Sequence, residues 1–230
     1  MALSPQDRAK QAAAVAAVAL IEDGMRLGLG TGSTAYFVVE ELAARIAREG
    51  LRVTGVATSI ATERHATERG IALRDLADLP ELDLAIDGAD EVERGTLRLT
   101  KGLGGALLRE KMVAQAARRF VIVADPSKVV DRLNSLAPLP VEVVPFAHPA
   151  VARRLPGQAV LRVKDGAPFR TDNGNVIYDC RGIAAAPDAV EAALCRIAGV
   201  VGHGFFLEGV ERAIIGREDG TVEVMLPTAD

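Results

Sequence analysis

A glutamate within an apolar stretch is the residue best suited to chemistry in this sequence of 230 residues. Glu110 follows the glycine-rich residues 101–105 and lies in a run of strong helix formers, residues 106–117. On a helix with about 3.6 residues per turn, Glu110 shares its face with Val113 and several alanines. Such surroundings solvate a carboxylate poorly and raise its pKa toward neutral pH, as proton transfer requires. The alternative is a structural glutamate that pairs with an arginine across a buried helix.

A glycine turn between an apolar and an amphipathic segment is a second candidate site. Residues 25–29 predict a buried strand, and residues 35–46 predict a helix that ends before Gly50. Bare N–H groups and a helix N-terminus in such a turn bind phosphate. Hydroxyl groups accompany the turn, which comprises Thr31, Gly32, Ser33 and Thr34.

The turn does not match the known nucleotide motifs. Ser33 stands where a dinucleotide fingerprint needs glycine or alanine, and no Walker A pattern occurs in the sequence. A single small phosphate therefore fits better than a nucleotide. The alternative is a tight turn capped by serine and threonine side chains.

Two aspartates follow the next predicted strand, residues 82–86. Asp87 and Asp90 come after this strand, where ligands bind in open α/β sheets. The pair could bind a divalent metal ion, hydrogen-bond sugar hydroxyls or relay protons, although the calcium-loop spacing is absent. An Asp-Gly turn is the structural alternative. We favour recognition of a sugar.

Lysine is scarce in this chain, since only five of its 27 basic residues are lysines. A sequence that otherwise uses arginine can keep lysine where a compact ammonium is needed. Lys10, Lys101 and Lys128 lie near glycine-rich or strand-end segments and are therefore candidates. For Lys128 a solvated surface position is the alternative.

The order of the expected elements predicts an α/β fold. Ser4 and Pro5 start a helix that we expect to reach Asp23. Strands and helices then alternate, which predicts a Rossmann-like, mostly parallel sheet with helices on both faces. The further expected elements of this part are strands at residues 52–57, 71–73 and 120–124 and a helix at residues 60–69.

Beyond residue 133 the pattern changes to strand, helix, two strands, helix and strand. This order predicts a smaller ferredoxin-like α+β domain, inserted before strands at residues 212–215 and 221–226 that return to the main sheet. We therefore expect a Rossmann-like catalytic domain at residues 1–132 and 208–230, and a second domain at 133–207. The expected elements of the second domain are residues 140–146, 149–155, 158–163, 175–181, 188–198 and 200–206.

Composition excludes several classes of protein. A net charge of −4 gives no basic surface for nucleic acid, no apolar run is long enough to span a membrane, and no export signal is visible. Cys180 and Cys195 are isolated, which favours reduced cysteines in the cytoplasm. The three histidines share no metal-ligand spacing, and no Gly-x-Ser-x-Gly elbow occurs.

With these segments in order, the chain resembles ribose-5-phosphate isomerase of the A type. The resemblance covers nearly the whole chain, and its matching stretches are Gly30-Thr-Gly-Ser-Thr-Ala35, Asp87-Gly-Ala-Asp-Glu91, Lys101-Gly-Leu-Gly-Gly-Ala, Arg109-Glu110-Lys111, Leu139-Pro-Val-Glu-Val143 and Thr171-Asp-Asn-Gly-Asn175. It implies a cytoplasmic enzyme of the pentose phosphate pathway that interconverts D-ribose 5-phosphate and D-ribulose 5-phosphate through an enediolate. It also implies a homodimer or homotetramer that needs no metal or organic cofactor.

The resemblance also implies roles for individual residues. Glu110 falls at the position of the proton acceptor. From the chemistry of the reaction we expect Lys101 to stabilise the developing oxyanion, and either Asp87 or Asp90 to assist opening of the furanose ring. The implied substrate-binding positions are Thr31, Gly32, Ser33, Thr34, Asp87, Gly88, Ala89, Asp90, Lys101, Gly102, Leu103, Gly104, Lys128 and, on the phosphate side, Lys10. Leu103 replaces a third consecutive glycine of the family, which costs energy if the loop needs a positive φ at that residue.

Two other classes of function compete with this interpretation. An amino-sugar phosphate isomerase/deaminase or a CoA-transferase-like relative would use a similar scaffold, but explains the aspartate pair and the lysine–glycine loop less well. A non-catalytic sugar-phosphate sensor would leave Glu110 without a task, and no helix-turn-helix segment precedes the first helix. Turnover of ribose 5-phosphate in EDTA separates these classes.

Overall fold

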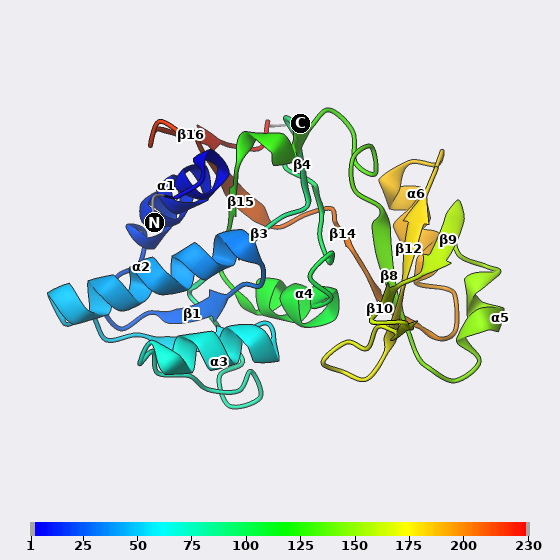
Figure 1. The fold of residues 1–230 in the computed structure, drawn as a ribbon, viewed down its shortest axis with the longest axis horizontal. Helices are drawn as coiled ribbons and strands as arrows, with labels where there is room; N and C mark the ends of the chain where they lie inside the picture. Colours follow the sequence, from blue (N-terminus) through cyan, green and yellow to red (C-terminus); the bar gives the residue numbers. More distant parts are fainter. Residues whose placement is uncertain (1–2, 229–230) are drawn as a thin grey trace.

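Six strands form the main sheet in the computed structural model, which describes residues 3–228 (Figure 1). Their order is β16-β15-β6-β3-β1-β2, and every neighbouring pair is parallel except β15 with β16. The strands are β1 (Arg26–Leu29), β2 (Thr54–Ala57), β3 (Leu84–Gly88), β6 (Phe120–Ala124), β15 (Val210–Gly216) and β16 (Val222–Met225). This arrangement confirms the predicted Rossmann-like, mostly parallel sheet.

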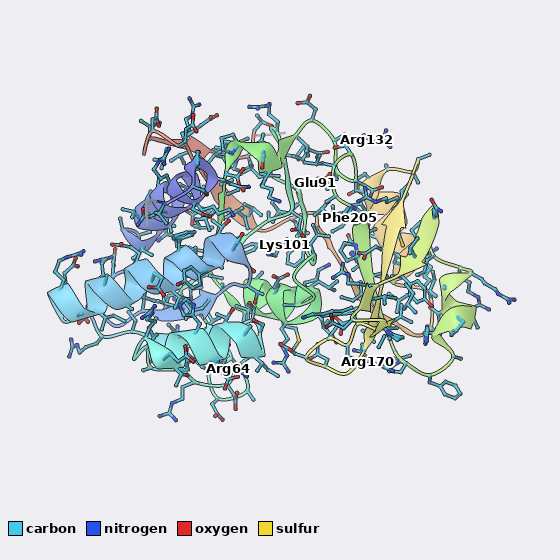
Figure 2. The ribbon with its side chains drawn as sticks, viewed as in Figure 1. Arg64, Glu91, Lys101, Arg132, Arg170 and Phe205 are labelled. Carbon is cyan, nitrogen blue, oxygen red and sulfur yellow. The ribbon has the colours of Figure 1, made fainter. Side chains whose placement is uncertain are left out.

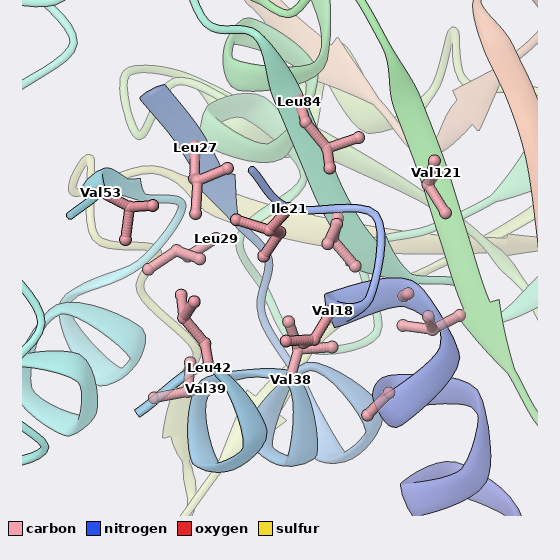
Figure 3. Packing of buried hydrophobic residues seen from close by; sticks show 14 of the residues in the cluster. Val18, Ile21, Leu27, Leu29, Val38, Val39, Leu42, Val53, Leu84 and Val121 are labelled. Atoms are coloured by element: carbon pink, nitrogen blue, oxygen red, sulfur yellow. The ribbon is translucent and has the colours of Figure 1, made fainter. Parts of the chain in front are cut away.

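Alternate residues of these strands enter two separate clusters of apolar side chains, one on each face of the sheet. Leu27 and Ile86 pack with residues of α1 (Pro5–Val18) and α2 (Ser33–Glu49), as Figure 3 shows for part of this cluster. Ala85 and Ile122 pack on the other face with residues of α4 (Leu107–Ala116). Because side chains alternate across a strand, burial on both faces requires nearly continuous apolar strands, which this sequence has.

The ends of the first helices differ in how well they were predicted. α2 ends as expected, since Gly50 adopts a left-handed φ of 68° at its C-cap. The prediction that α1 reaches Asp23 is wrong, because the helix ends at Val18. Short-range bonds then turn the chain, with Ile21 N–H donating to Val18 C=O at 3.0 Å, and lead it into β1.

Three strand predictions need correction. Residues 71–73 form only an isolated bridge between Gly55 and Leu73. The strand expected at residues 82–86 is shifted to Leu84–Gly88, so that Asp87 lies within the strand. The strand expected at residues 200–206 is two strands, β13 (Val200–His203) and β14 (Phe205–Phe206), since Gly204 bonds to Pro140 and Lys101 and passes the chain from one sheet to another.

A second, antiparallel sheet has the order β13-β8-β12-β9. Numbered along the chain within this sheet, the order is 4-1-3-2, as in the ferredoxin-like motif. The apolar side chains between this sheet and its helices form a cluster of their own. Its further elements are β8 (Leu139–Val143), α5 (His148–Ala152), β9 (Gln158–Leu161), β12 (Val176–Arg181) and α6 (Pro187–Leu194).

A small sheet that the sequence did not predict draws strands from both parts of the chain. Its order is β14-β5-β4-β7, with β4 (Glu91–Glu93), β5 (Leu99–Thr100) and β7 (Val129–Val130). The division into residues 1–132 with 208–230 and residues 133–207 stays a prediction. Three further elements complete the fold: α3 (Ile60–Glu68), the 3₁₀ turn η1 (Pro126–Lys128) and the hairpin of β10 (Val163–Lys164) with β11 (Ala167–Pro168). No helix in the described part of the chain has the length and hydropathy to cross a membrane.

Candidate active site

The candidate site lies where the strand order of the main sheet reverses, at β1. The chain runs from β1 to β2 on one side, whereas β3 lies on the other side of β1. The crevice beyond the carboxyl ends of two such strands is where open α/β sheets bind ligands. Gly30 follows β1 and lies so close to Asp87 of β3 that a Cβ at position 30 would overlap the Asp87 carboxylate.

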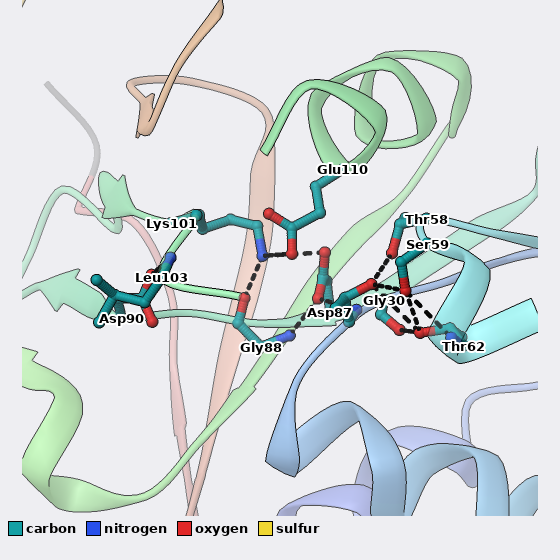
Figure 4. Close-up of polar contacts among 12 residues, drawn as sticks. Gly30, Thr58, Ser59, Thr62, Asp87, Gly88, Asp90, Lys101, Leu103 and Glu110 are labelled. Atoms are coloured by element: carbon teal, nitrogen blue, oxygen red, sulfur yellow. Dashed lines mark hydrogen bonds and ion pairs between the residues drawn. The ribbon is translucent and has the colours of Figure 1, made fainter. Parts of the chain in front are cut away.

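A buried ammonium joins the elements around this crevice (Figure 4). Lys101 Nζ donates to Gly88 C=O at 2.5 Å, and it lies 2.9 Å from Asp87 Oδ2 and 3.5 Å from Glu110 Oε1. The side chains of Lys101, Asp87 and Glu110 are 3% exposed or less. Lys101 is held by its own backbone N–H, which donates to Gly204 C=O at 2.8 Å. Two acids therefore share one cation out of contact with bulk water.

Asp87 and Glu110 differ in protonation because their surroundings differ. Burial raises the pKa of Glu110 to about 8, against the attraction of Lys101 and with the help of the Asp87 charge. Burial also raises the pKa of Asp87, but Lys101 and two N–H groups act against it. Because Asp87 Oδ1 accepts from Thr31 N–H at 3.0 Å and from Gly88 N–H at 2.7 Å, we assign the charge to Asp87 and the proton to Glu110.

Lys101 remains an ammonium despite its burial. Burial by itself lowers the pKa of Lys101, but the neighbouring acids, above all the charged Asp87, raise it above its ordinary value. Within residues 3–228, Glu110 Oε2 is buried and has no hydrogen-bond partner. This oxygen is therefore free to exchange a proton with a bound molecule.

Most of the predicted site residues surround one cavity of about 80 Å³. It is lined by Thr31, Gly32, Ser33, Thr34, Gly88, Ala89, Asp90, Lys101, Gly102, Gly104, Glu110 and Lys128. Asp87 lies behind this lining, in contact with Lys101. Lys10 is not part of the lining; it is a buried residue of α1 whose Nζ lies 3.7 Å from Asp7 Oδ1.

Leu103 fits the glycine loop without a positive φ. The left-handed conformations fall on its neighbours Gly102, with a φ of 104°, and Gly105, with a φ of 81°. The leucine side chain is exposed, while its backbone N–H donates to Asp90 Oδ2 at 2.9 Å. The predicted cost of leucine in this loop is therefore absent.

Asp90 is a further acid in the lining of this cavity. Burial raises the pKa of Asp90, whereas the Leu103 N–H and the charges of Lys101, Lys128 and Arg162 lower it. Asp90 is therefore a hydrogen-bonding group that faces the same cavity as the ammonium.

A cluster of hydroxyl groups beside the glycine turn was missed in the sequence. Thr31 Oγ1 lies 2.7 Å from Thr58 Oγ1, 2.8 Å from Ser59 Oγ and 3.2 Å from Thr62 Oγ1. Thr62 also donates to Gly30 C=O at 2.9 Å. The signal was present, because β1 and β2 are neighbouring parallel strands and each is followed by hydroxyl residues, Thr31 after β1 and Thr58 with Ser59 after β2. The cluster holds the turn in a fixed conformation.

Neither a cluster of metal ligands nor a larger cavity gives a second candidate active site in the described residues. Among residues 3–228, no group of three or more His, Cys, Asp or Glu side chains is arranged to hold a metal ion. Two larger cavities, of about 500 and 720 Å³, do not contain the buried pair of Lys101 and Glu110. The chemistry of the side chains, rather than volume, selects the small cavity.

Comparison with known proteins points to one family. The family model for ribose 5-phosphate isomerase A (phosphoriboisomerase A) matches residues 54–220. The ribose-5-phosphate isomerase A of Roseiflexus sp. is 53% identical over 226 residues, which covers 96% of this chain and 97% of the relative. That of Gloeobacter violaceus is 52% identical over 227 residues, covering 97% of this chain and 98% of the relative.

Solved structures agree with the sequence relatives. The ribose 5-phosphate isomerase A of Methanocaldococcus jannaschii superposes with a TM-score of 0.90 at 41% identity, covering 94% of this chain and 97% of that structure. A D-ribose-5-phosphate isomerase in complex with phospho-erythronic acid superposes with a TM-score of 0.90 at 34% identity, covering 96% of this chain and 99% of that structure.

Proposed function

The chain belongs to the ribose 5-phosphate isomerase A family, and from this membership we propose how its residues interconvert D-ribose 5-phosphate and D-ribulose 5-phosphate. The enzyme is an aldose–ketose isomerase of the pentose phosphate pathway, and its reaction passes through an enediolate. One observation carries the assignment of roles: Glu110, whose buried Oε2 has no hydrogen-bond partner among the described residues, lines the same small cavity as Lys101.

Glu110 is the base that moves the carbon-bound proton. In the forward direction its carboxylate takes the proton from carbon 2 of the open-chain aldose and returns it to carbon 1. The hydroxyl proton of oxygen 2 ends on oxygen 1, so the product is the ketose and no atom is gained or lost. A raised pKa matches the carboxyl to this task, because it binds the proton firmly enough to hold it and weakly enough to return it.

Lys101 stabilises the negative charge that develops on the oxygens. General acid–base catalysis contributes about a hundred- to ten-thousandfold, so a further term is required. A well-placed donor toward a developing oxyanion contributes about 3 kcal/mol, by analogy with acyl-transfer sites. Lys101 and the N–H groups of the glycine loop fill this role. Asp87 holds the ammonium in place, and Asp90 binds a sugar hydroxyl.

The glycine turn binds the phosphate and holds the sugar in register. Residues 32–34 place backbone N–H groups at the start of α2, where the helix dipole favours an anion, whereas the Thr31 N–H is bonded to Asp87 Oδ1. Lys128 adds a positive charge on the same cavity. Lys10 is the remaining phosphate-side candidate and would act from outside the present lining. Because the phosphate takes no part in the chemistry, its binding energy serves to position the reacting carbons.

Location and assembly complete the proposal. Cys180 and Cys195 are both free, which supports a reducing compartment and hence the cytoplasm. The resemblance to the family supports a homo-oligomer, and light scattering of the purified protein distinguishes a homodimer from a homotetramer.

A coupled assay with ribose 5-phosphate in EDTA tests the proposed mechanism. We expect turnover by the wild-type protein and a loss of kcat by about a hundred- to ten-thousandfold in Glu110→Gln, which keeps the shape but cannot accept the proton. Glu68→Gln, at an exposed glutamate of α3, is the matched control and should keep wild-type activity. Near-native turnover by folded Glu110→Gln would remove the assignment of the base, and a requirement for metal would remove the mechanism. Saturable binding without turnover would favour a sensor.

A further inference from the structure

Arg162 reaches from the second sheet to the backbone of the glycine loop. It lies between β9 and β10, and its Nη1 donates to Gly102 C=O at 2.9 Å and to Leu103 C=O at 3.1 Å. The other side of the guanidinium pairs with Asp179 of β12, with Nε to Oδ2 at 2.9 Å and Nη2 to Oδ1 at 2.5 Å. Because the arginine side chain is only 14% exposed and its fork is bound at both sides, its position is fixed.

The carbonyls of Gly102 and Leu103 both accept from the Arg162 guanidinium, and this fixes the orientation of two successive peptide planes. The described chain has no cis peptide bonds, and in a trans peptide the C=O and N–H groups point in opposite directions. The N–H groups of Leu103 and Gly104 must therefore point away from Arg162. Leu103 N–H does so and donates to Asp90 Oδ2, while Gly104 lies in the lining of the cavity.

Besides Arg162, these planes are held by the Gly105 N–H, which donates to Gly102 C=O at 3.0 Å, and by the bond from Leu103 N–H to Asp90. Gly102 and Gly105 both have positive φ, and glycine allows neighbouring peptides to rotate at little steric cost. Phe169, whose N–H donates to Arg162 C=O at 2.9 Å, packs its ring where a Cβ of Gly105 would lie. The Arg162 guanidinium lies 5.8 Å from the centre of this ring. One cation and one ring, from the segment that follows β9 and includes the β10–β11 hairpin, thus hold the loop.

We propose that Arg162 is a positioning residue for the isomerisation. It holds the peptides on both sides of Leu103 so that the Leu103 N–H keeps Asp90 in place and the Gly104 N–H faces the oxygens of the bound sugar. Arg162 touches neither the substrate nor the reacting atoms and acts through the loop. This inference rests on the function proposed above, and it gives the second sheet an indirect part in catalysis, through the glycine loop.

Arg162→Met tests the proposal, since methionine keeps an unbranched apolar stem and removes the donors. We expect kcat to fall about ten- to a hundredfold while KM changes less than about threefold, because the effect concerns the orientation of donors in the transition state. Binding of phospho-erythronic acid should weaken with kcat. The fall of kcat at a nearly unchanged KM is the result that a merely structural defect would not give.

Arg132→Met is the matched control. Arg132 Nη2 also donates to two successive carbonyls, those of Ile183 and Ala184, at 3.3 Å each. Figure 2 shows Arg132 well separated from Lys101, so its removal should leave kcat unchanged. An equal fall of kcat in Arg132→Met would overturn the proposal, as would wild-type kcat and analogue affinity in Arg162→Met.

A second variant covers the case in which Arg162→Met does not fold. Asp179→Asn leaves the guanidinium but removes the carboxylate that orients it, and we expect kcat to fall about three- to tenfold. Unchanged kcat in this variant would then refute the positioning role. Failure of the proposed function can be distinguished from failure of the positioning role. In the first case the wild-type protein itself would show no turnover, while analogue binding by the variants would still report on the loop.

Discussion

Replacing Glu110 with glutamine should inactivate the protein and at the same time raise its free energy of unfolding. The buried carboxyl has its pKa raised from 4.5 to about 8, so the folded state holds a proton that the unfolded chain releases above pH 4.5. The wild-type protein therefore loses stability as the pH rises through this window, and the loss levels off above about pH 8. A neutral amide has no such dependence.

The magnitude follows from the proton linkage. Each pH unit above 4.5 costs about 1.4 kcal/mol until the folded-state carboxyl ionises. Between pH 4.5 and pH 7, the free energy of unfolding of the wild type should fall by about 3 kcal/mol relative to Glu110→Gln. The variant is more stable by the free energy of unfolding that the wild type loses when it keeps an ionisable carboxyl in a buried site.

Denaturant unfolding at fixed protein concentration from pH 4.5 to pH 8.5 measures this difference. The gap between Glu110→Gln and wild type should widen steadily with pH, whereas Glu68→Gln should follow the wild type throughout. A gap of constant size across this range would show that the Glu110 pKa is not raised in the folded protein. The assignment of the proton to Glu110, rather than to Asp87, would then be wrong.

Four further outcomes follow from the same geometry. The acidic limb of kcat/KM against pH should lie well above the ordinary carboxyl pKa of 4.5 and toward about 8, where Glu110 ionises; a limb near 4.5 would contradict the raised value. Lys101→Met should lower kcat by about a hundred- to a thousandfold and destabilise the fold by about 3–5 kcal/mol, because two buried acids lose their cation; steady-state kinetics and denaturant unfolding measure both. Gly30→Ala should abolish turnover in the coupled assay, since its Cβ would displace the Asp87 carboxylate; near-native activity would show that the turn can yield. Glu91→Gln should lower the free energy of unfolding by about 2–3 kcal/mol, because this buried carboxylate accepts N–H bonds from residues 134–137, and equal stability would refute that anchoring role.

The local signals in the sequence were sufficient for much of the site. The glycine turn after β1, a buried strand near Asp87 and the burial of Glu110 follow from apolar periodicity and residue type, which act over a few neighbouring residues. The ends of that strand were placed two residues too early, since β3 is Leu84–Gly88. Because open α/β sheets bind ligands beyond the carboxyl ends of their strands, Asp87 and Asp90 were expected to lie at a ligand site. The cavity that joins Thr31, Asp90 and Glu110 agrees with that expectation.

The tertiary structure alone decided the contacts between distant segments. The two-residue strands β5, β7 and β14 are too short for a periodic signal, so the small sheet that orients Lys101 was not expected. Arg162 lies 60 residues after Gly102, whose carbonyl it contacts. No local pattern distinguishes it from other arginines. Short-range preferences therefore specify which residues can do the chemistry. The long-range packing of the two sheets specifies their protonation and orientation, because burial and distance exist only in the folded chain.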